Sequence, residues 1–389
     1  MFEFGIIQDD GDASALTQLA QQTFNFPASY YAEWFERLGA NAYRVIRKQG
    51  KIVAGLAIYE AGQWFGGQPV TMGGIAMVCV DPTQRRQGVG RQLLAATLHD
   101  LRDRGTALST LFPSTLRAYR RLGFEQAGSW YTQTHPLLPP HDQTDRLPMR
   151  QVDKLRPEEF DELAERRARR TEGNLQRSQT HWQRLFDPRG NPTPVRGYLL
   201  GDKEDQGYLI YLQEKLAGVD RIVIKDMTAE TPLAANTLWS FLHGHGTTVD
   251  NCVWSGPAVD PLLMATTECD PKILNARRWM SRVVDVKRAL ESRGYRCPHS
   301  RSLDLEVVDE ALPENSGRYT LNIENGRGTL KTGGPGTLKM DARGLASLYT
   351  GFCSAYDLQI AGRVDAPAEI LQVADQIFVG TSPWMPDYF

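Results

Sequence analysis

The sequence lacks long apolar runs and a strong charge bias. No run reaches the roughly 18 apolar residues of a transmembrane helix, so we expect no membrane partner. Residues 1–12 are acidic and lack a basic segment, so we expect no secretory signal peptide. The 44 basic and 46 acidic residues give a net charge of −2, which indicates no nucleic-acid partner.

Cysteine and histidine are also scarce. The five cysteines are scattered without a C-x-x-C pair, which argues against a zinc site and favours the reducing cytoplasm. The one close histidine pair, His243 and His245, has an i, i+2 spacing that does not place two ligands on one helical face. We therefore expect no metal.

What the chain does have is the alternation of an α/β protein. Its 389 residues, 41% hydrophobic and 23% charged, suit two or three ordinary soluble domains. In the first part, strands and helices alternate as expected of an α/β domain around a mixed sheet. The expected strands are 4–8, 42–48, 51–60, 68–80, 107–112 and 123–137, and the expected helices are 12–24, 29–39, 91–104 and 114–121. A proline-rich, polar linker is expected over 136–148.

The second part of the chain repeats this order, which indicates a weak internal duplication. A strand and a charged helix are expected over 149–170, strands over 207–227 and a helix over 228–246. "RIVIKDM" stands where "IAMVCVD" stands in the first part, and a helix follows both. Between Met227 and Leu238 there is no glycine or arginine, and Pro232 begins the helix. We therefore expect a copy that binds no phosphate.

The third part reads as an α+β layer. A hairpin is expected over 317–332, with Asn325-Gly326 at its turn. Helices are expected over 340–352 and 366–378, each with an aspartate placed to cap it.

One stretch of the first part, "MVCVDPTQRRQGVGRQLL" (77–94), combines a strand, a basic turn, two glycines and a helix. Free amides and the helix dipole at a helix N-terminus attract anions, and glycines let a phosphate approach the backbone. The Walker A pattern is absent, and Leu93 occupies the third glycine position of the dinucleotide fingerprint. What remains is Arg85-x-x-Gly88-x-Gly90.

This remaining pattern resembles the Q/R-x-x-G-x-G/A signature of the GCN5-related N-acetyltransferase (GNAT) family, whose turn cradles the pyrophosphate of acetyl-CoA. "TLRAYRRLGFE" (115–125) is similar to the short helix and strand start that close the core of that family. The resemblance implies acetyl-CoA as co-substrate. It also implies cofactor contacts from Val78, Cys79, Val80, Arg85, Arg86, Gln87, Gly88, Val89, Gly90, Arg91, Ser114 and Thr115.

The chain end, "TSPWMPDYF" (381–389), is unlike a frayed terminus. Three aromatic residues and a methionine favour burial, and two prolines lower the entropy cost of ordering it. Burial would fix the terminal carboxylate of Phe389, raise its pKa and make it a better base. No glutamate or histidine of the first part stands out for that role.

As a whole, the chain resembles the Eis family of multi-acetylating N-acetyltransferases. The resemblance implies a catalytic GNAT domain (1–140), a degenerate GNAT-like domain (141–285) and a sterol-carrier-like domain (286–389) whose tail reaches the active site. It also implies a homohexamer and a polyamine-type acceptor such as an aminoglycoside, acetylated at several positions. Tyr119 would be the general acid and the Phe389 carboxylate the general base. The acceptor contacts would include Phe24, Asn25, Phe26, Trp34, Met77 and Asp387.

Two departures from the family weaken the expectation of a polycationic acceptor. Asn25 stands where relatives carry an acidic residue, and Tyr388 takes the place of the penultimate acidic residue, with Asp387 before it. We expect direct attack in a ternary complex, because Cys79 lies in an apolar strand without a paired histidine. The alternatives are a peptide or protein lysine N-acetyltransferase of narrow specificity and a non-enzymatic lipid-carrier module.

Overall fold

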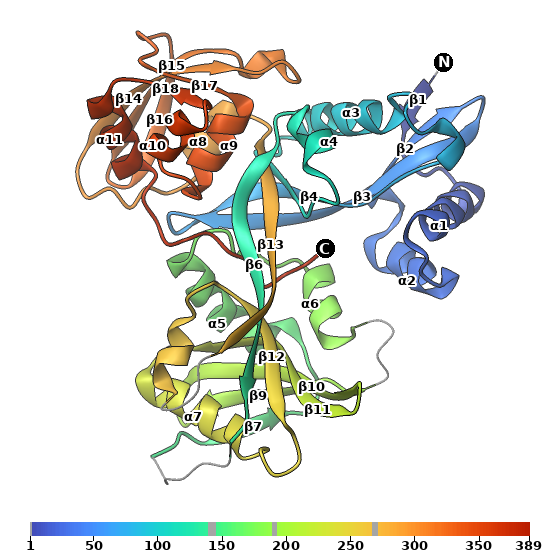
Figure 1. Cartoon of the computed structure of the whole chain (residues 1–389), viewed down its shortest axis with the longest axis vertical. Coiled ribbons are helices and arrows are strands. Elements are labelled where there is room, and N and C mark those ends of the chain that lie inside the picture. The colour runs from blue at the N-terminus through green and yellow to red at the C-terminus, as the bar shows by residue number, and fades with distance from the viewer. Residues whose placement is uncertain (1, 139–144, 189–192, 267–270) are drawn as a thin grey trace.

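The computed structural model describes residues 2–138, 145–188, 193–266 and 271–389, without the side chains of residues 28–30, 32 and 33. The predicted linker over 136–148 therefore lies partly outside the described residues. Among these, a 13-stranded mixed sheet runs through the first two thirds of the chain, and a separate 5-stranded sheet organises the last third. In Figure 1 the long strands β6 and β13 stand at the centre of the molecule and connect its upper and lower parts.

The first unit surrounds the long hairpin of β3 and β4, whose near-continuous apolar stretches are buried. Its strands are β1 (Phe2–Gly5), β2 (Tyr43–Lys48), β3 (Lys51–Phe65), β4 (Gln68–Val80), β5 (Leu108–Leu111) and β6 (Glu125–Pro136). Its helices are α1 (Asp10–Phe24), α2 (Ala28–Leu38), α3 (Val89–Asp103) and α4 (Leu116–Arg120), with short 3-10 turns η1 (Ala40–Ala42) and η2 (Pro82–Gln84). In Figure 1, α3 and α4 lie on one side of β4, whereas α1 and α2 lie on the other.

The second unit repeats the strand, helix and parallel strand of the first, as the sequence predicts. Its strands are β7 (Met149–Val152), β8 (Leu175–Gln176), β9 (Arg196–Gly201), β10 (Asp205–Leu216), β11 (Val219–Ala229), β12 (Asn251–Gly256) and β13 (Lys272–Val283). Its helices are α5 (Pro157–Arg170), α6 (Gln179–Phe186) and α7 (Pro232–His243), with the 3-10 turn η3 (Pro261–Ala265). The pair β4 and β5 and the pair β11 and β12 are both parallel, and α3 and α7 connect them.

The two units share one sheet because each contributes a strand to the joint. The strand order is β5-β13-β6-β12, so β13, late in the second unit, lies between two strands of the first. The sequence predicts β6 but gives no signal for β13. Its residues Lys272–Arg278 are exposed and carry no apolar alternation.

The third unit packs four helices with its sheet. Its strands are β14 (Arg301–Val308), β15 (Gly317–Glu324), β16 (Arg327–Thr332), β17 (Leu338–Asp341) and β18 (Val364–Asp365). Its helices are α8 (Val286–Ser292), α9 (Ala342–Thr350), α10 (Ala355–Ile360) and α11 (Ala368–Ile377), with the 3-10 turn η4 (Pro313–Asn315).

Local signals in this unit are partly confirmed. The predicted hairpin is present, and Asn325 and Gly326 have φ of 50° and 73°, as a tight turn with two left-handed residues requires. Asp341 caps α9 by accepting a hydrogen bond from the Gly344 amide at 2.7 Å. The predicted aspartate cap of α11 is wrong: Pro367 begins that helix without a side-chain cap, because Asp365 is still part of strand β18.

Candidate active site

Strands β4 and β5 separate at the point where the predicted cofactor residues begin. They pair only from Met72 and Leu108 to Ile75 and Leu111, and β4 continues to Val80 without β5 beside it. The pairing of β4 with β3 also shifts register there. Met77, at this shift, has φ of 55°, a left-handed conformation that is rare for a non-glycine residue and typical of bulges near functional sites. Residues 77–80 therefore have no pairing partner on β5.

The glycine turn after β4 is built as an anion site. Gly88 is the N-cap of α3 with φ of 82°, has no capping side chain, and a Cβ there would meet no atom within 4 Å. A Cβ on Gly90 would lie 3.3 Å from Val80 Cγ2, so this position keeps the helix start close to β4. The amides of the first turn of α3 and the helix dipole therefore face open space.

The predicted cofactor residues surround the opening between β4 and β5 in three groups. Val78, Cys79 and Val80 end β4, and Ser114 and Thr115 precede α4 on the other side of the opening. The remainder form the exposed turn and the start of α3, namely Arg85, Arg86, Gln87, Gly88, Val89, Gly90 and Arg91, of which only Val89 is buried.

The second unit lacks this anion site, as the sequence predicts. Helix α7 begins with Pro232, which has no amide hydrogen, and the Thr231 side chain accepts a hydrogen bond from the Ala234 amide at 3.2 Å. The first turn of α7 therefore has fewer free donors than that of α3.

Tyr119 is placed on α4 with its side chain 6% exposed. Burial raises its pKa above the ordinary value of 10, and the nearby Ser114 hydroxyl opposes this only in part. The phenol is thus protonated at neutral pH and can donate a proton.

The chain end lies inside the molecule. The ring of Phe389 packs on Gly74 of β4 so closely that a Cβ there would lie 2.7 Å from Phe389 Cε2. Its centroid is 5.8 Å from that of Tyr59 and 5.9 Å from that of Phe112, and the residue is 6% exposed.

Tyr119 and Phe389 lie on opposite faces of the first-unit sheet. Tyr119 belongs to the core cluster that contains Ile75 and Leu111, on the α3 side. Phe389 belongs to the cluster that contains Ala76 and Cys79, on the α1 side. Beyond Ile75 no pairing with β5 closes the sheet between the two faces, and no hydrogen bond or ring contact between described residues joins Tyr119 to Phe389 directly.

The tail reaches this position by threading between the first two units (Figure 1). The Ser129 amide of β6 donates to the Pro383 carbonyl at 2.9 Å. On the other side, the Trp384 amide donates to the Glu172 carbonyl at 3.0 Å, and Asn174 Nδ2 donates to the Trp384 carbonyl at 2.8 Å. The tail backbone is therefore held by both units.

Asp387, predicted to contact the acceptor, is buried and takes part in an ion-pair network, and its Oδ2 has no hydrogen-bond partner among the described residues. Arg177 Nε lies 2.9 Å from Asp387 Oδ1, and Arg177 Nη1 lies 2.5 Å from Asp226 Oδ2. Although burial opposes its ionisation, the guanidinium groups of Arg167 and Arg177 hold the pKa of Asp226 well below the usual range. Asp387 thereby fixes the tail to the second unit.

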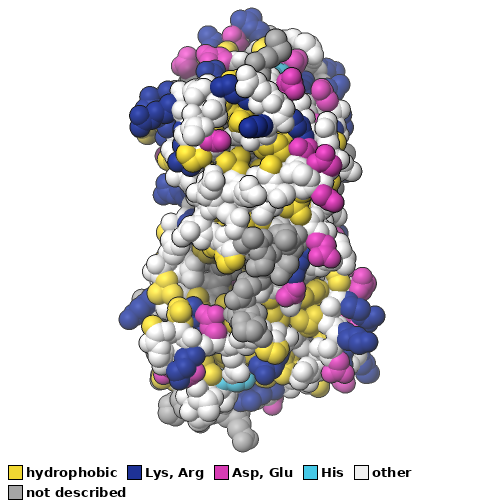
Figure 2. All heavy atoms as spheres, turned by 90° about the vertical axis from the view of Figure 1, so that its right-hand side faces the viewer, with side chains coloured by type: hydrophobic (Ala, Val, Ile, Leu, Met, Phe, Trp, Pro, Cys, Tyr) yellow, Lys and Arg dark blue, Asp and Glu magenta, His cyan; other side chains and the backbone are white. Residues whose placement is uncertain are grey.

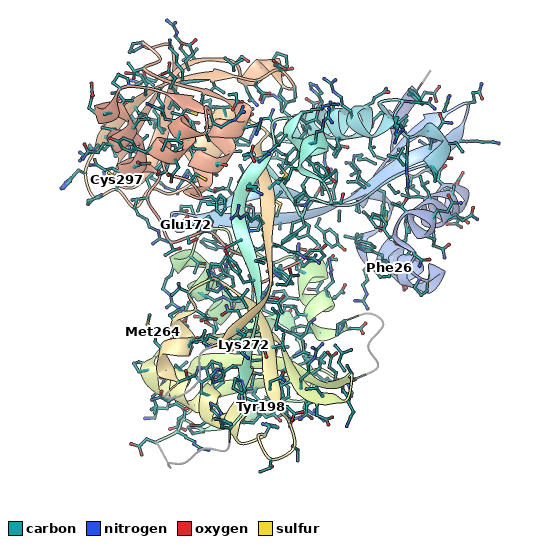
Figure 3. The ribbon with its side chains drawn as sticks, in the orientation of Figure 1. Phe26, Glu172, Tyr198, Met264, Lys272 and Cys297 are labelled. Atoms are coloured by element: carbon teal, nitrogen blue, oxygen red, sulfur yellow. The ribbon has the colours of Figure 1, made fainter. Side chains whose placement is uncertain are left out.

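The predicted acceptor residues do not all come together. Phe24 and Phe26, at the end of α1, are 39% and 51% exposed, and Asn25 is the left-handed C-cap of that helix. Figure 3 shows Phe26 at the edge of the α1–α2 pair that faces the middle of the molecule. Trp34 is half-buried and its Nε1 donates to the hydroxyl of Tyr59, whereas Met77 is buried in the same cluster as Phe389.

Figure 2 shows the face of the molecule that forms the right-hand side of Figure 1. Hydrophobic side chains gather in its upper part and again in its lower half, and charged side chains lie mainly along its edges.

Sequence reasoning missed several residues around Phe389. Tyr59 of β3 and Phe112 after β5 belong to the first unit, but His181 comes from α6 of the second. Burial lowers the pKa of His181 to about 4, with Asp387 opposing this shift, so the imidazole is neutral at pH 7. No motif marks these residues, because the fold alone brings them together.

Cys79 is not suited to covalent catalysis. Burial raises its pKa to about 12, and its Sγ lies 3.4 Å from the Gly55 carbonyl. A thiol held in its neutral form is a poor nucleophile.

Within the described residues, no three histidine, cysteine or acidic side chains gather as a metal site. No helix of the described ranges is long and apolar enough to cross a membrane.

Family models match all three units of the chain. Acetyltransferase (GNAT) domains match residues 7–127 and 173–283, and a sterol carrier protein domain matches residues 286–386. The crystal structure of a GCN5-related N-acetyltransferase from Anabaena variabilis is 35% identical, covers 100% of both chains and superposes with a TM-score of 0.95. The fold and the matched domains thus define a GNAT acetyltransferase.

Proteins with similar sequences indicate which family of GNAT acetyltransferases the chain resembles. An N-acetyltransferase of Streptomyces avermitilis is 30% identical over 83% of this chain and 82% of its own length. The N-acetyltransferase Eis of Mycobacterium tuberculosis is 27% identical over 86% of this chain and 85% of its own length. The chain belongs to the Eis-like family of GNAT N-acetyltransferases, with tandem GNAT domains and a sterol-carrier-like domain. Acetyltransferases of this fold use acetyl-CoA as the acetyl donor.

Proposed function

We propose that this N-acetyltransferase moves the acetyl group of acetyl-CoA to a primary amine of a small molecule, by direct attack in a ternary complex. The observation that carries the proposal is the opening between β4 and β5, with an anion turn at one face of the sheet and the buried chain end at the other. Acetyl-CoA would occupy the α3 face and the acceptor amine the Phe389 face, so that both reach the opening.

The proposed step uses this chain's residues as follows. The amine nitrogen attacks the thioester carbonyl carbon and gives its proton to the terminal carboxylate of Phe389. Backbone amides of residues 77–80 stabilise the negative charge on the carbonyl oxygen. The C–S bond then breaks, and Tyr119 donates its proton to the departing sulfur. Burial of Tyr119 supports its role, because it disfavours the tyrosinate. The placement of the Phe389 ring inside the molecule supports a fixed position for the chain end.

For the acceptor, we propose a small amine, and family resemblance nominates a polyamine such as an aminoglycoside, acetylated at several positions. The described charges argue for weak binding of a polycation. Asp387 is paired with Arg177, Asp187 is paired with Arg37, and position 25 is an uncharged asparagine. Carboxylates already paired add little attraction for further cations.

A panel of amines tests this proposal. The panel contains an aminoglycoside, spermidine, a hydrophobic monoamine and a lysine-containing peptide, each incubated with acetyl-CoA. Release of free thiol measures turnover, and product mass counts the acetyl groups. Turnover with small amines supports the proposal, turnover confined to the peptide supports a protein lysine acetyltransferase, and no turnover with any amine supports a lipid-carrier module.

We also propose, on family resemblance, that the protein is a cytoplasmic homohexamer. Light scattering of the purified chain gives the mass directly, and a mass near that of one 43.6 kDa chain would overturn this.

A further inference from the structure

The second unit has lost the anion turn but has kept the opening between its parallel strands. Strands β11 and β12 pair from Arg221 and Asn251 to Ile224 and Trp254, and then separate as β4 and β5 do. A cavity of about 680 Å³ lies at this separation, lined by residues 224–229, 254, 255 and 257–262. Ligands of open α/β sheets bind in such crevices at the carboxyl ends of the strands. We name this cavity the β11–β12 cleft.

The remaining walls of the β11–β12 cleft come from two distant parts of the chain. The end of α5 contributes Arg167, Arg170 and Thr171, and the tail contributes Thr381, Ser382 and Trp384. In Figure 3, the labelled Met264 of η3 and Glu172, which holds Trp384, both lie on the left of the view. The cleft is thus distinct from the opening at Phe389, although the same tail borders both.

The chemistry of the walls disfavours a cationic ligand. Met227, Trp254, Leu262 and Trp384 supply apolar surface. Both acidic groups on the walls are engaged: Asp226 is paired with Arg167, and Asp260 accepts from Trp254 Nε1 and the Leu262 amide at 3.0 Å each. Lys225 also lines the cleft, and burial lowers its pKa. A cation would lose hydration there without gaining a free counter-charge.

The volume matches a small molecule. Sites for drug-sized ligands are mostly apolar and measure about 300 to 1,000 Å³. We propose that the β11–β12 cleft is a second ligand site, which binds a molecule with an alkyl or aromatic body and no positive charge, and does not bind CoA. A ligand there would pack against Trp384, five residues before the chain end, and so would contact the tail.

Three probes of equal chain length test the site: 1-octanol, octanoate and octyltrimethylammonium. Binding to the full-length protein, saturated with CoA, is measured by calorimetry. Tryptophan fluorescence, to which Trp254 and Trp384 contribute, gives a second readout. We expect 1-octanol and octanoate each to bind at least about tenfold more tightly than octyltrimethylammonium. Equal affinity for the three probes, or no binding of 1-octanol, would overturn the proposal.

Ala258→Trp places a large side chain on the wall of the cleft, and Ala361→Trp, at an exposed alanine of the third unit, is the matched control. We expect Ala258→Trp to weaken 1-octanol binding at least about tenfold and Ala361→Trp to leave it unchanged, with both variants melting cooperatively. Equal binding by both variants refutes the assignment to this cleft. Because no acetyl transfer enters these readouts, an inactive protein that still binds 1-octanol would overturn the proposed function and leave this inference standing.

Discussion

The position of the chain end can be tested with one methyl group. Consecutive residues of β4 point to opposite faces of the sheet. A Cβ on Gly74 would lie 2.7 Å from the Phe389 ring, whereas a Cβ on Gly73 would lie 2.7 Å from Leu101 Cδ2 of α3. Gly74→Ala and Gly73→Ala therefore each bring a methyl group equally close to a neighbouring side chain, but on opposite faces of the sheet. Only the methyl group of Gly74→Ala meets the tail.

The size of the effect follows from the overlap. The Phe389 ring must retreat by about 0.7 Å to restore an ordinary contact of 3.4 Å. Misplacing a reacting group by about 1 Å costs about 10²-fold in rate. We therefore expect Gly74→Ala to lower kcat about 10- to 100-fold, which corresponds to about 1.4 to 2.7 kcal/mol in the activation free energy.

The assay is thiol release at saturating acetyl-CoA with the best amine of the panel, and thermal unfolding of each variant reports its stability. We expect both variants to lose stability, and only Gly74→Ala to lose kcat, with the KM for acetyl-CoA nearly unchanged. If kcat of Gly74→Ala stays within twofold of that of Gly73→Ala, the chain end takes no part in acetyl transfer.

The remaining predictions concern the cofactor turn and the two catalytic groups. Gly88→Ala should raise the KM for acetyl-CoA at least about tenfold, because a side chain strains the left-handed backbone of the anion turn. Gly218 also has a positive φ and no atom near its Cβ position, so Gly218→Ala should cost similar stability but leave this KM unchanged. Equal KM values for the two variants would show that the turn does not bind acetyl-CoA. Tyr119→Phe should lower the single-turnover rate about 10²- to 10⁴-fold with acetyl-CoA affinity retained, and an unchanged rate would remove Tyr119 as the acid. Deprotonation of Tyr119 at high pH should remove the general acid and lower kcat. Because burial raises the pKa of Tyr119, we expect this loss of kcat to begin only near or above pH 10. Amidation of Phe389 should abolish most turnover while acetyl-CoA still binds, and Phe389→Ala, which keeps the carboxylate, should retain more; full activity after amidation would reject the carboxylate as base.

Elements that depend on a few neighbouring residues were predicted well from the sequence. Strand β4 has the predicted bounds, and the glycine turn leads into α3 as expected. The Asn325-Gly326 hairpin is likewise local, because two residues with positive φ determine its turn. That no glycine turn precedes α7 could also be predicted, because Pro232 and the lack of glycine before it are visible in the sequence.

Features that depend on distant segments were not predicted. Strand β13 is half exposed and charged, so its place between β5 and β6 comes from sheet pairing rather than from its own pattern. The buried ion pair of Asp387 with Arg177, more than two hundred positions away in the chain, was not predicted, and the expected contact of Asp387 with the acceptor stays a prediction. No local signal could show this partner.

The family was recognised from the resemblance of its motifs. The cofactor turn and the burial of the apolar tail could be predicted from neighbouring residues, because they follow from short-range backbone preferences and from the cost of exposing apolar surface. Where that tail goes depends on the tertiary structure. The tail threads between β6 and the second unit, sets Phe389 on Gly74 beside Tyr59 and His181, and leaves the β11–β12 cleft open beside Trp384. Such placements depend on the packing of all three units at once, and a linear pattern does not contain that information.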